Sequence, residues 1–106
     1  MLNNDQLAEK LAQSPSPNRL TPEYIDSRIG VPSFFRASET LTICVLKSVN
    51  GFEVVGKSAC ADPANYDQAI GERVAFDDAK RQIWQLEGYL LRQTLHLQEQ
   101  AVASGN

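Results

Sequence analysis

The most regular hydrophobic pattern in the chain lies between Gly71 and Gln98. Apolar residues recur there at spacings of three, four and seven, which places them in one stripe on an α-helix. This stripe comprises Phe76, Ala79, Ile83, Leu86, Leu90 and Leu97. A second stripe beside it comprises Trp84, Gly88, Leu91 and Leu95. Because one stripe is enough to cover a small sheet, the surplus predicts a second packing partner, either another helix of the chain or another copy of it.

A β-hairpin is predicted upstream of this helix. Residues 39–49 are rich in β-branched side chains, and Asn50-Gly51 is the favoured dipeptide of a two-residue turn, so residues 52–60 should return as the second strand. In that register the expected core face carries Leu41, Ile43, Val45, Val49, Phe52 and Val54, and the opposite face is mixed. Gly56 in mid-strand indicates a close approach, and we expect Trp84 to fill the space above it.

Shorter elements come before the hairpin. Residues 3–13 predict a short helix, which the Ser-Pro-rich segment 14–18 ends. Residues 21–30 predict a second short helix, because Thr and Pro open it and Gly closes it. Phe34 and Phe35 are then expected in a loop, either as a plug over the core or as an exposed contact.

The helical segment after the hairpin begins with Asp62 as a cap and Pro63 in the first turn. Gly71 either breaks this segment from the long helix or only weakens a continuous one. The predicted fold class is therefore α+β. Short N-terminal helices precede a β-hairpin at about 39–60, which packs on a long C-terminal helix or a broken helix pair at about 63–98.

The length of 106 residues fits one domain with a modest core. We expect residues 1–20 to form a flexible N-terminal arm, residues 21–98 to form the single α+β domain, and residues 99–106 to form a frayed tail.

Composition and charge narrow the classes of partner. A net charge of −3 and a pI near 5.0 argue against a nucleic-acid-binding surface, whose affinity depends on Lys and Arg. No apolar run approaches the roughly 18 residues of a membrane span, and the first residues lack the features of a signal peptide. The sequence therefore predicts a cytosolic protein with neither a nucleic-acid nor a membrane partner.

Candidate catalytic residues are few. His96, the only histidine, lies near the end of the helix, where an exposed position is expected. Cys44 and Cys60 form no close ligand pair, and the predicted register points them to opposite faces, which argues against a disulfide. Asp77 and Asp78 are adjacent and point in different directions on a helix, so they form no acid–base pair. We therefore predict no catalytic residues, no metal, no cofactor and no enzymatic activity.

Trp84, Glu87, Gly88 and Tyr89 form a cluster on the helix whose residue types packing alone does not require. Tryptophan and tyrosine are frequent anchors of interfaces, and a helical glycine costs about 1 kcal/mol relative to alanine. Both features are explained if another molecule lies against the helix at Trp84 and Gly88. The alternative is that Trp84 belongs to the core, Gly88 is tolerated and Glu87 is solvated. The candidate interaction residues are Trp84, Glu87, Gly88, Tyr89, Leu91 and Leu95.

Four short motifs carry a family resemblance. They are Asn50-Gly51-Phe52, Ser58-Ala59-Cys60, the run DPANYD at 62–67 and the run IWQLEGY at 83–89. Over roughly residues 21–95 the chain resembles a family of small tailed-bacteriophage proteins, shared by N-four-like and Sf-six-like podoviruses and prophages. The resemblance implies a phage accessory protein acting in the host cytoplasm, and it supplies no activity and no catalytic residues.

The leading hypothesis is a non-enzymatic phage accessory protein that binds and modulates a host protein, such as a defence protein, and forms a homo-oligomer through its C-terminal helix. One alternative is a homo-oligomeric sponge that sequesters a small nucleotide signal at its subunit junctions. The aromatic residues of the protein would stack on the base of the nucleotide. The phosphates of the nucleotide would contact some of Arg28, Arg36, Lys57, Arg73 and Arg81. Another alternative is a minor virion component.

Overall fold

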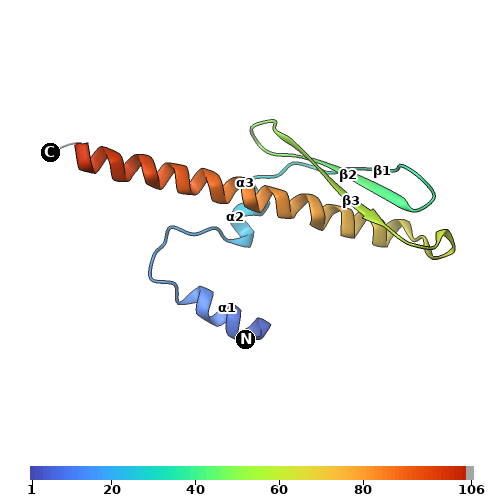
Figure 1. Ribbon diagram of the computed structural model, residues 1–106, viewed down its shortest axis with the longest axis horizontal. Helices are drawn as coiled ribbons and strands as arrows, with labels where there is room; N and C mark the ends of the chain where they lie inside the picture. The colour runs from blue at the N-terminus through green and yellow to red at the C-terminus, as the bar shows by residue number, and fades with distance from the viewer. Residues whose placement is uncertain (105–106) are drawn as a thin grey trace.

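A long helix, α3, supports the rest of the fold (Figure 1). The computed structural model describes residues 1–104. Its elements are α1 (Asn4–Ala12), α2 (Pro22–Ser27), β1 (Ser33–Arg36), β2 (Leu41–Lys47), β3 (Glu53–Ala59), a 3₁₀ turn (Pro63–Asn65) and α3 (Gln68–Ser104). The strands form one antiparallel sheet in the order β1-β2-β3, which lies along the first half of α3. The α+β class is confirmed.

Helix α3 is continuous through Gly71, so the broken-pair alternative is wrong. Asp62 caps only the 3₁₀ turn, where its carboxylate accepts from the Ala64 N–H at 2.9 Å. The long helix starts later because Asp67 accepts from the Ile70 N–H at 3.1 Å, as an N-cap residue does. Residues 99–104, expected in a frayed tail, are helical, and the last two residues of that predicted tail lie outside the described residues.

The hairpin turn differs from the predicted one. Ser48 and Phe52 close a three-residue loop, in which the Phe52 carbonyl accepts from the Ser48 N–H at 2.7 Å. A two-residue type I′ turn needs a positive φ at both of its central residues. Gly51 has a φ of +91° and is the only described residue with a positive φ, so this turn type is excluded. The extra loop residue shifts the pairing by one position, so Cys44 instead of Val45 lies opposite Gly56.

A one-residue shift in register exchanges the two faces of a strand. The face toward α3 carries Thr42, Cys44, Leu46 and Ser48 from β2 and its loop, with Val54 and Gly56 from β3. Leu41, Ile43 and Val45 therefore face away from α3, and placing them in the core was wrong. Cys44 is buried, Cys60 is half-buried beyond β3, and both thiols are free.

Small residues on α3 explain this choice of face. Its buried stripe consists of every fourth residue, namely Gly71, Ala75, Ala79, Ile83 and Glu87. Of the predicted stripe, Ala79 and Ile83 are buried, Phe76 is half-buried, and Leu86, Leu90 and Leu97 are exposed. A stripe of glycine and alanine lets the helix backbone approach the sheet closely, which larger side chains would prevent.

Phe34 and Phe35 form part of an edge strand and not a loop. β1 pairs with β2, with Phe34 opposite Cys44 and Phe35 opposite Ile43. Alternation along the strand turns Phe34 toward the core, where it is half-buried, and turns Phe35 outward. Phe34 therefore packs on the core, as one alternative expected, and Phe35 is exposed.

Candidate functional site

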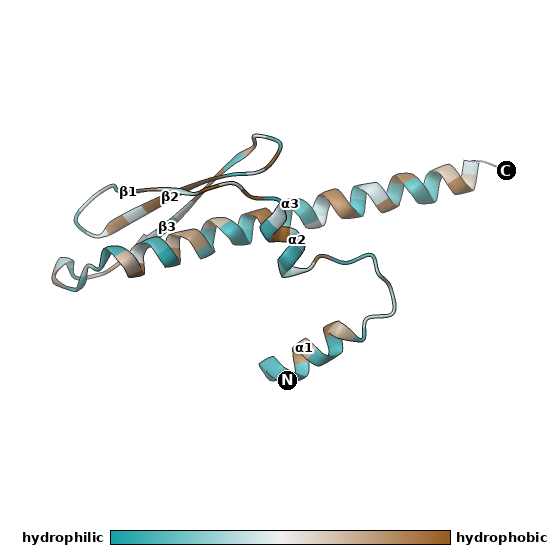
Figure 2. Cartoon of the chain, turned by 180° about the vertical axis from the view of Figure 1, so that it is seen from behind, coloured by the Kyte–Doolittle hydropathy of each residue, from teal (hydrophilic) through white to brown (hydrophobic). Residues whose placement is uncertain are grey.

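The candidate interaction residues lie where α3 leaves the sheet. The buried stripe ends at Glu87, and the helix then projects beyond the sheet (Figure 1). We call residues 88–104 the distal half of α3. Figure 2 shows hydrophobic and hydrophilic residues alternating along this projecting segment. Among the described residues, no helix combines the length and apolar character needed to cross a membrane.

Trp84 packs against the core cluster but does not fill the space above Gly56. A Cβ added to Gly56 would overlap the Ala75 carbonyl oxygen and the Ala79 amide nitrogen, so the backbone of α3 occupies that space. The close approach predicted at Gly56 is therefore present, but the backbone of α3 makes it and the Trp84 side chain does not. Trp84 is half-buried, which agrees in part with the alternative that Trp84 belongs to the core.

Glu87 is a buried carboxylate in an ion pair. Its side chain is 7% exposed, and its Oε1 accepts from the Nε of Arg28 at 2.9 Å. This hydrogen bond raises the pKa of Arg28 above its ordinary value, which keeps the guanidinium charged. Arg92, the next arginine along α3, pairs with Glu99 at 2.9 Å. Glu87 thus links the end of α2 to α3, and it is buried, whereas the alternative interpretation expected it to be solvated.

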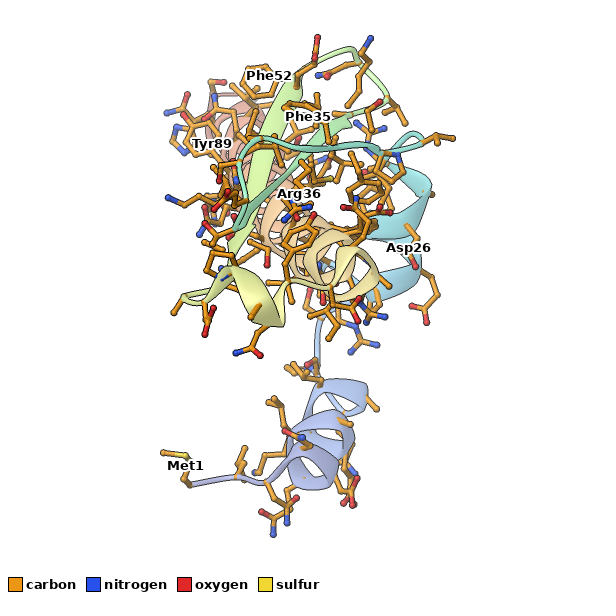
Figure 3. The ribbon with its side chains drawn as sticks, turned by 90° about the vertical axis from the view of Figure 1, so that its right-hand side faces the viewer. Met1, Asp26, Phe35, Arg36, Phe52 and Tyr89 are labelled. Atoms are coloured by element: carbon orange, nitrogen blue, oxygen red, sulfur yellow. The ribbon has the colours of Figure 1, made fainter. Side chains whose placement is uncertain are left out.

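Packing among the described residues does not require a glycine at position 88. A Cβ added there would lie 3.8 Å from the Cδ1 of Leu20, which is an ordinary van der Waals contact. Tyr89, the next residue, is 72% exposed and is labelled on the flank of the molecule in Figure 3. Among the predicted site residues, Tyr89 is the most accessible to a partner.

Leu91 and Leu95 are half-buried on the distal half of α3. Leu91 lines a groove of about 320 Å³ between α3 and the segment that precedes α2. The groove is also lined by Pro17, Asn18, Arg19, Leu20, Tyr24, Glu87, Leu90 and Thr94. Its base is mainly apolar, and its one buried carboxylate, that of Glu87, is already paired.

No catalytic geometry is formed by the residues considered for chemistry. His96 is exposed on the distal half of α3, whereas Cys44 is buried in the sheet. Asp77 pairs with Arg73 at 3.1 Å, and Asp78 pairs with Arg81 at 3.2 Å. Within residues 1–104, no group of three or more His, Cys, Asp or Glu side chains is arranged to hold a metal ion.

The cations considered for phosphate binding are spread over the molecule. Arg28, Arg73 and Arg81 are each paired with a carboxylate of their own chain. Arg36 stacks over the ring of Tyr66, with its Cζ 3.7 Å from the ring centroid.

Sequence reasoning missed a second apolar surface, on the side of the sheet that faces away from α3. Phe35, Ile43, Val45 and Val55 contribute to it from the three strands. The alternating pattern of residues 41–47 was a visible signal, because both of its phases contain apolar residues.

A family model described as Phage protein (N4 Gp49/phage Sf6 gene 66) family matches residues 20–95. The match covers most of the chain and confirms the family resemblance over nearly the same residues. No curated protein and no solved structure matches the chain. The arm that contains α1 and the last turns of α3 lie outside the matched region.

Proposed function

Because the chain belongs to the Phage protein (N4 Gp49/phage Sf6 gene 66) family, we propose that it is a non-enzymatic phage accessory protein that binds and modulates a host protein in the host cytoplasm. The observation that carries this proposal is the exposed apolar surface of the distal half of α3. This surface, which we call the distal-helix surface, comprises the exposed side chains of Tyr89, Leu90 and Leu97.

A projecting helix of this kind suits recognition by a groove. An isolated helix of this length is marginally stable in water, so covering its apolar side would stabilise it. Amphipathic helices bind by placing apolar anchors into a hydrophobic groove of the partner. Tyr89 is the natural anchor, because aromatic residues supply much of the binding energy at interfaces.

Gly88, the residue before Tyr89, separately supports a partner at this part of the helix. The residue costs about 1 kcal/mol relative to alanine in a helix interior. Leu20 leaves room for an alanine side chain, so contacts within the chain do not explain this cost. A partner that packs directly on the helix next to Tyr89 would explain it.

A host defence protein or regulatory protein is the class of target that we propose. A phage benefits directly from modulating such proteins, and binding alone is sufficient to block them. No catalytic group is needed for this mode of action.

The proposal is tested by recovering complexes of the tagged protein from host cells that express it. We expect one host protein to copurify with the wild type and to be lost with Tyr89→Ala. The matched control is Ile70→Ala, which removes an exposed apolar side chain from the half of α3 that lies along the sheet. Circular dichroism should show equal helix content in both variants.

Two outcomes would contradict the proposal. One is recovery of no host protein, and the other is equal recovery with wild type and Tyr89→Ala. Native mass spectrometry of the same samples shows whether the distal-helix surface instead binds a second copy of the chain, which is the competing use of this helix.

A further inference from the structure

The centre of the sheet face that points away from α3 is apolar, and no other element of residues 1–104 covers it. We call Phe35, Ile43, Val45 and Val55 the outer sheet face. Phe35 is 51% exposed and Val55 is 54% exposed, although both lie in paired strands. Figure 3 shows Phe35 on the side of the sheet away from α3. An antiparallel sheet with one solvated face usually carries polar side chains there, so this face is expected to be covered.

Pairing of strands at the β3 edge is blocked by α3. The outward N–H of Lys57 donates to the Asp78 carboxylate at 2.9 Å. The outward carbonyl of Val55 accepts from the Gln82 amide at 2.6 Å. Because these backbone groups are already bonded, another strand cannot add to this edge without breaking the bonds. A partner would therefore cover the face of the sheet and not extend its β3 edge.

The charged residues on β3 are placed so that they can pair with the same residues of a second copy. Glu53 and Lys57 stand on the same face as Val55, two positions before it and two positions after it. If a two-fold axis crosses the strands at the level of Val55, the direction of β3 is reversed in the second copy. Glu53 of one copy then lies over Lys57 of the other, and this contact occurs twice.

We propose that the outer sheet face packs against the same face of a second copy, forming a two-fold symmetric sheet-on-sheet dimer. Isologous contact of this kind is the commonest arrangement of homo-oligomers. Val45 and Val55 lie at the centre of the contact, and the Glu53–Lys57 pairs lie at its rim. This dimer leaves the distal-helix surface free.

The dimer is expected to be weak. Seven residues at about 3.3 Å each and three strands about 4.8 Å apart give a face of roughly 23 by 14 Å. Such a face is small relative to the roughly 800 Å² that each partner buries in a standard interface. Association should therefore depend on concentration in the micromolar range.

Sedimentation equilibrium of the purified full chain across the micromolar range tests the proposal. We expect the wild type to move from its 11.7 kDa mass to twice that mass as concentration rises. Val55→Lys should remain monomeric, because it places two lysines together at the two-fold axis. Val74→Lys is the matched control, since it introduces the same charge at an exposed apolar position on α3 and should dimerise normally.

Charge exchange supplies the second test. Lys57→Glu should weaken dimerisation at least tenfold, because it places a second carboxylate against Glu53 of the other copy. Lys57→Glu combined with Glu53→Lys should restore it. Glu53→Lys alone is harder to interpret, because Lys47 lies opposite position 53 within the same chain and the substitution would also place two lysines together there. Thermal unfolding verifies that each variant is folded.

A wild type that stays monomeric throughout the range would overturn the proposal. A dimer that tolerates Val55→Lys, or that is lost with Tyr89→Ala, would also overturn it, and in the latter case the helix would be the interface. Because the host-protein experiment depends on Tyr89 and the dimer experiment depends on Val55, the two proposals can fail separately.

Discussion

At the scale of single residues, the tightest constraint in the fold is the glycine at position 56. The backbone of α3 lies directly against it, and the Cβ of Ala79 would be 2.8 Å from an added Cβ. No flexible side chain is available to move aside, because the other overlapping atoms belong to the helix backbone.

Gly56→Ala should therefore destabilise the protein by about 3 kcal/mol, at the upper end of the usual cost of overpacking. Gly88→Ala is the matched control, because its added methyl group has room, and it should stabilise the protein by about 0.5–1 kcal/mol. Urea denaturation of the two variants measures both effects. Equal stability of the two would mean that α3 does not lie against β3 as described.

The buried thiol of Cys44 is a second constraint at this scale. Burial raises the pKa of Cys44, because the interior disfavours the thiolate. A raised pKa in the folded state stabilises the fold below the pKa of the unfolded chain, and this contribution is lost as the pH rises through the folded-state pKa.

We expect the free energy of unfolding to fall as the pH rises above about 8.5, the ordinary pKa of a cysteine. The dependence should be smaller in Cys44→Ala, which has no thiol to titrate. Thermal unfolding of both proteins at a series of alkaline pH values measures the difference. Parallel profiles would show that Cys44 contributes nothing to the pH dependence.

At the scale of elements, α3 protects the β3 edge of the sheet. The carboxylate of Asp78 and the amide of Gln82 bond the outward backbone groups of β3. An open strand edge is a common route to aggregation, so these contacts protect the monomer as well as stabilise it.

Asp78→Ala should lower stability by about 0.5–1.5 kcal/mol, the usual worth of one hydrogen bond, and should increase aggregation. Asp77→Ala is the neighbouring control, because the Asp77 carboxylate contacts only an exposed arginine among the bonds described. Such a surface pair contributes little. Denaturation and light scattering on heating compare the two variants. Aggregation of both to the same extent would remove the edge-protecting role.

At the scale of the whole molecule, the support along α3 is uneven. The sheet lies along its first half, whereas the distal half projects beyond the sheet and is contacted only by α2 and the segment that precedes it, among the described residues. The molecule is correspondingly elongated, with extents of 65 × 35 × 20 Å. A helix with little packing on it opens locally at low cost in free energy.

Amide hydrogen exchange should therefore be faster in residues 88–104 than in residues 71–87 of the free protein. A bound host protein should slow exchange in the distal half if the distal-helix surface is its site. Mass spectrometry of peptides from α3 measures both. Uniformly slow exchange along α3 in a dilute solution of the free protein would show that the distal half is stable without a partner.

The amino-acid sequence alone determined the fold class, the order of most elements and the long C-terminal helix. Those features depend on neighbours in the chain: apolar spacing defines α3, β-branched residues define β2, and Thr21 with Pro22 starts α2. The short edge strand β1 escaped detection because four residues carry too little of the pattern. The exposure of Tyr89 and the pairing of Glu87 with Arg28 also could not be read from helical spacing.

Only the tertiary structure decided the register of the hairpin and the face of the sheet that is buried. Both faces carry apolar residues, so hydrophobicity does not choose between them. The choice depends on whether a helix edge of glycine and alanine fits against Gly56, and this fit joins residues distant in the sequence. That packing buries Cys44 and Leu46 and leaves Val45 and Val55 outside, because only the small side chains let the two backbones meet.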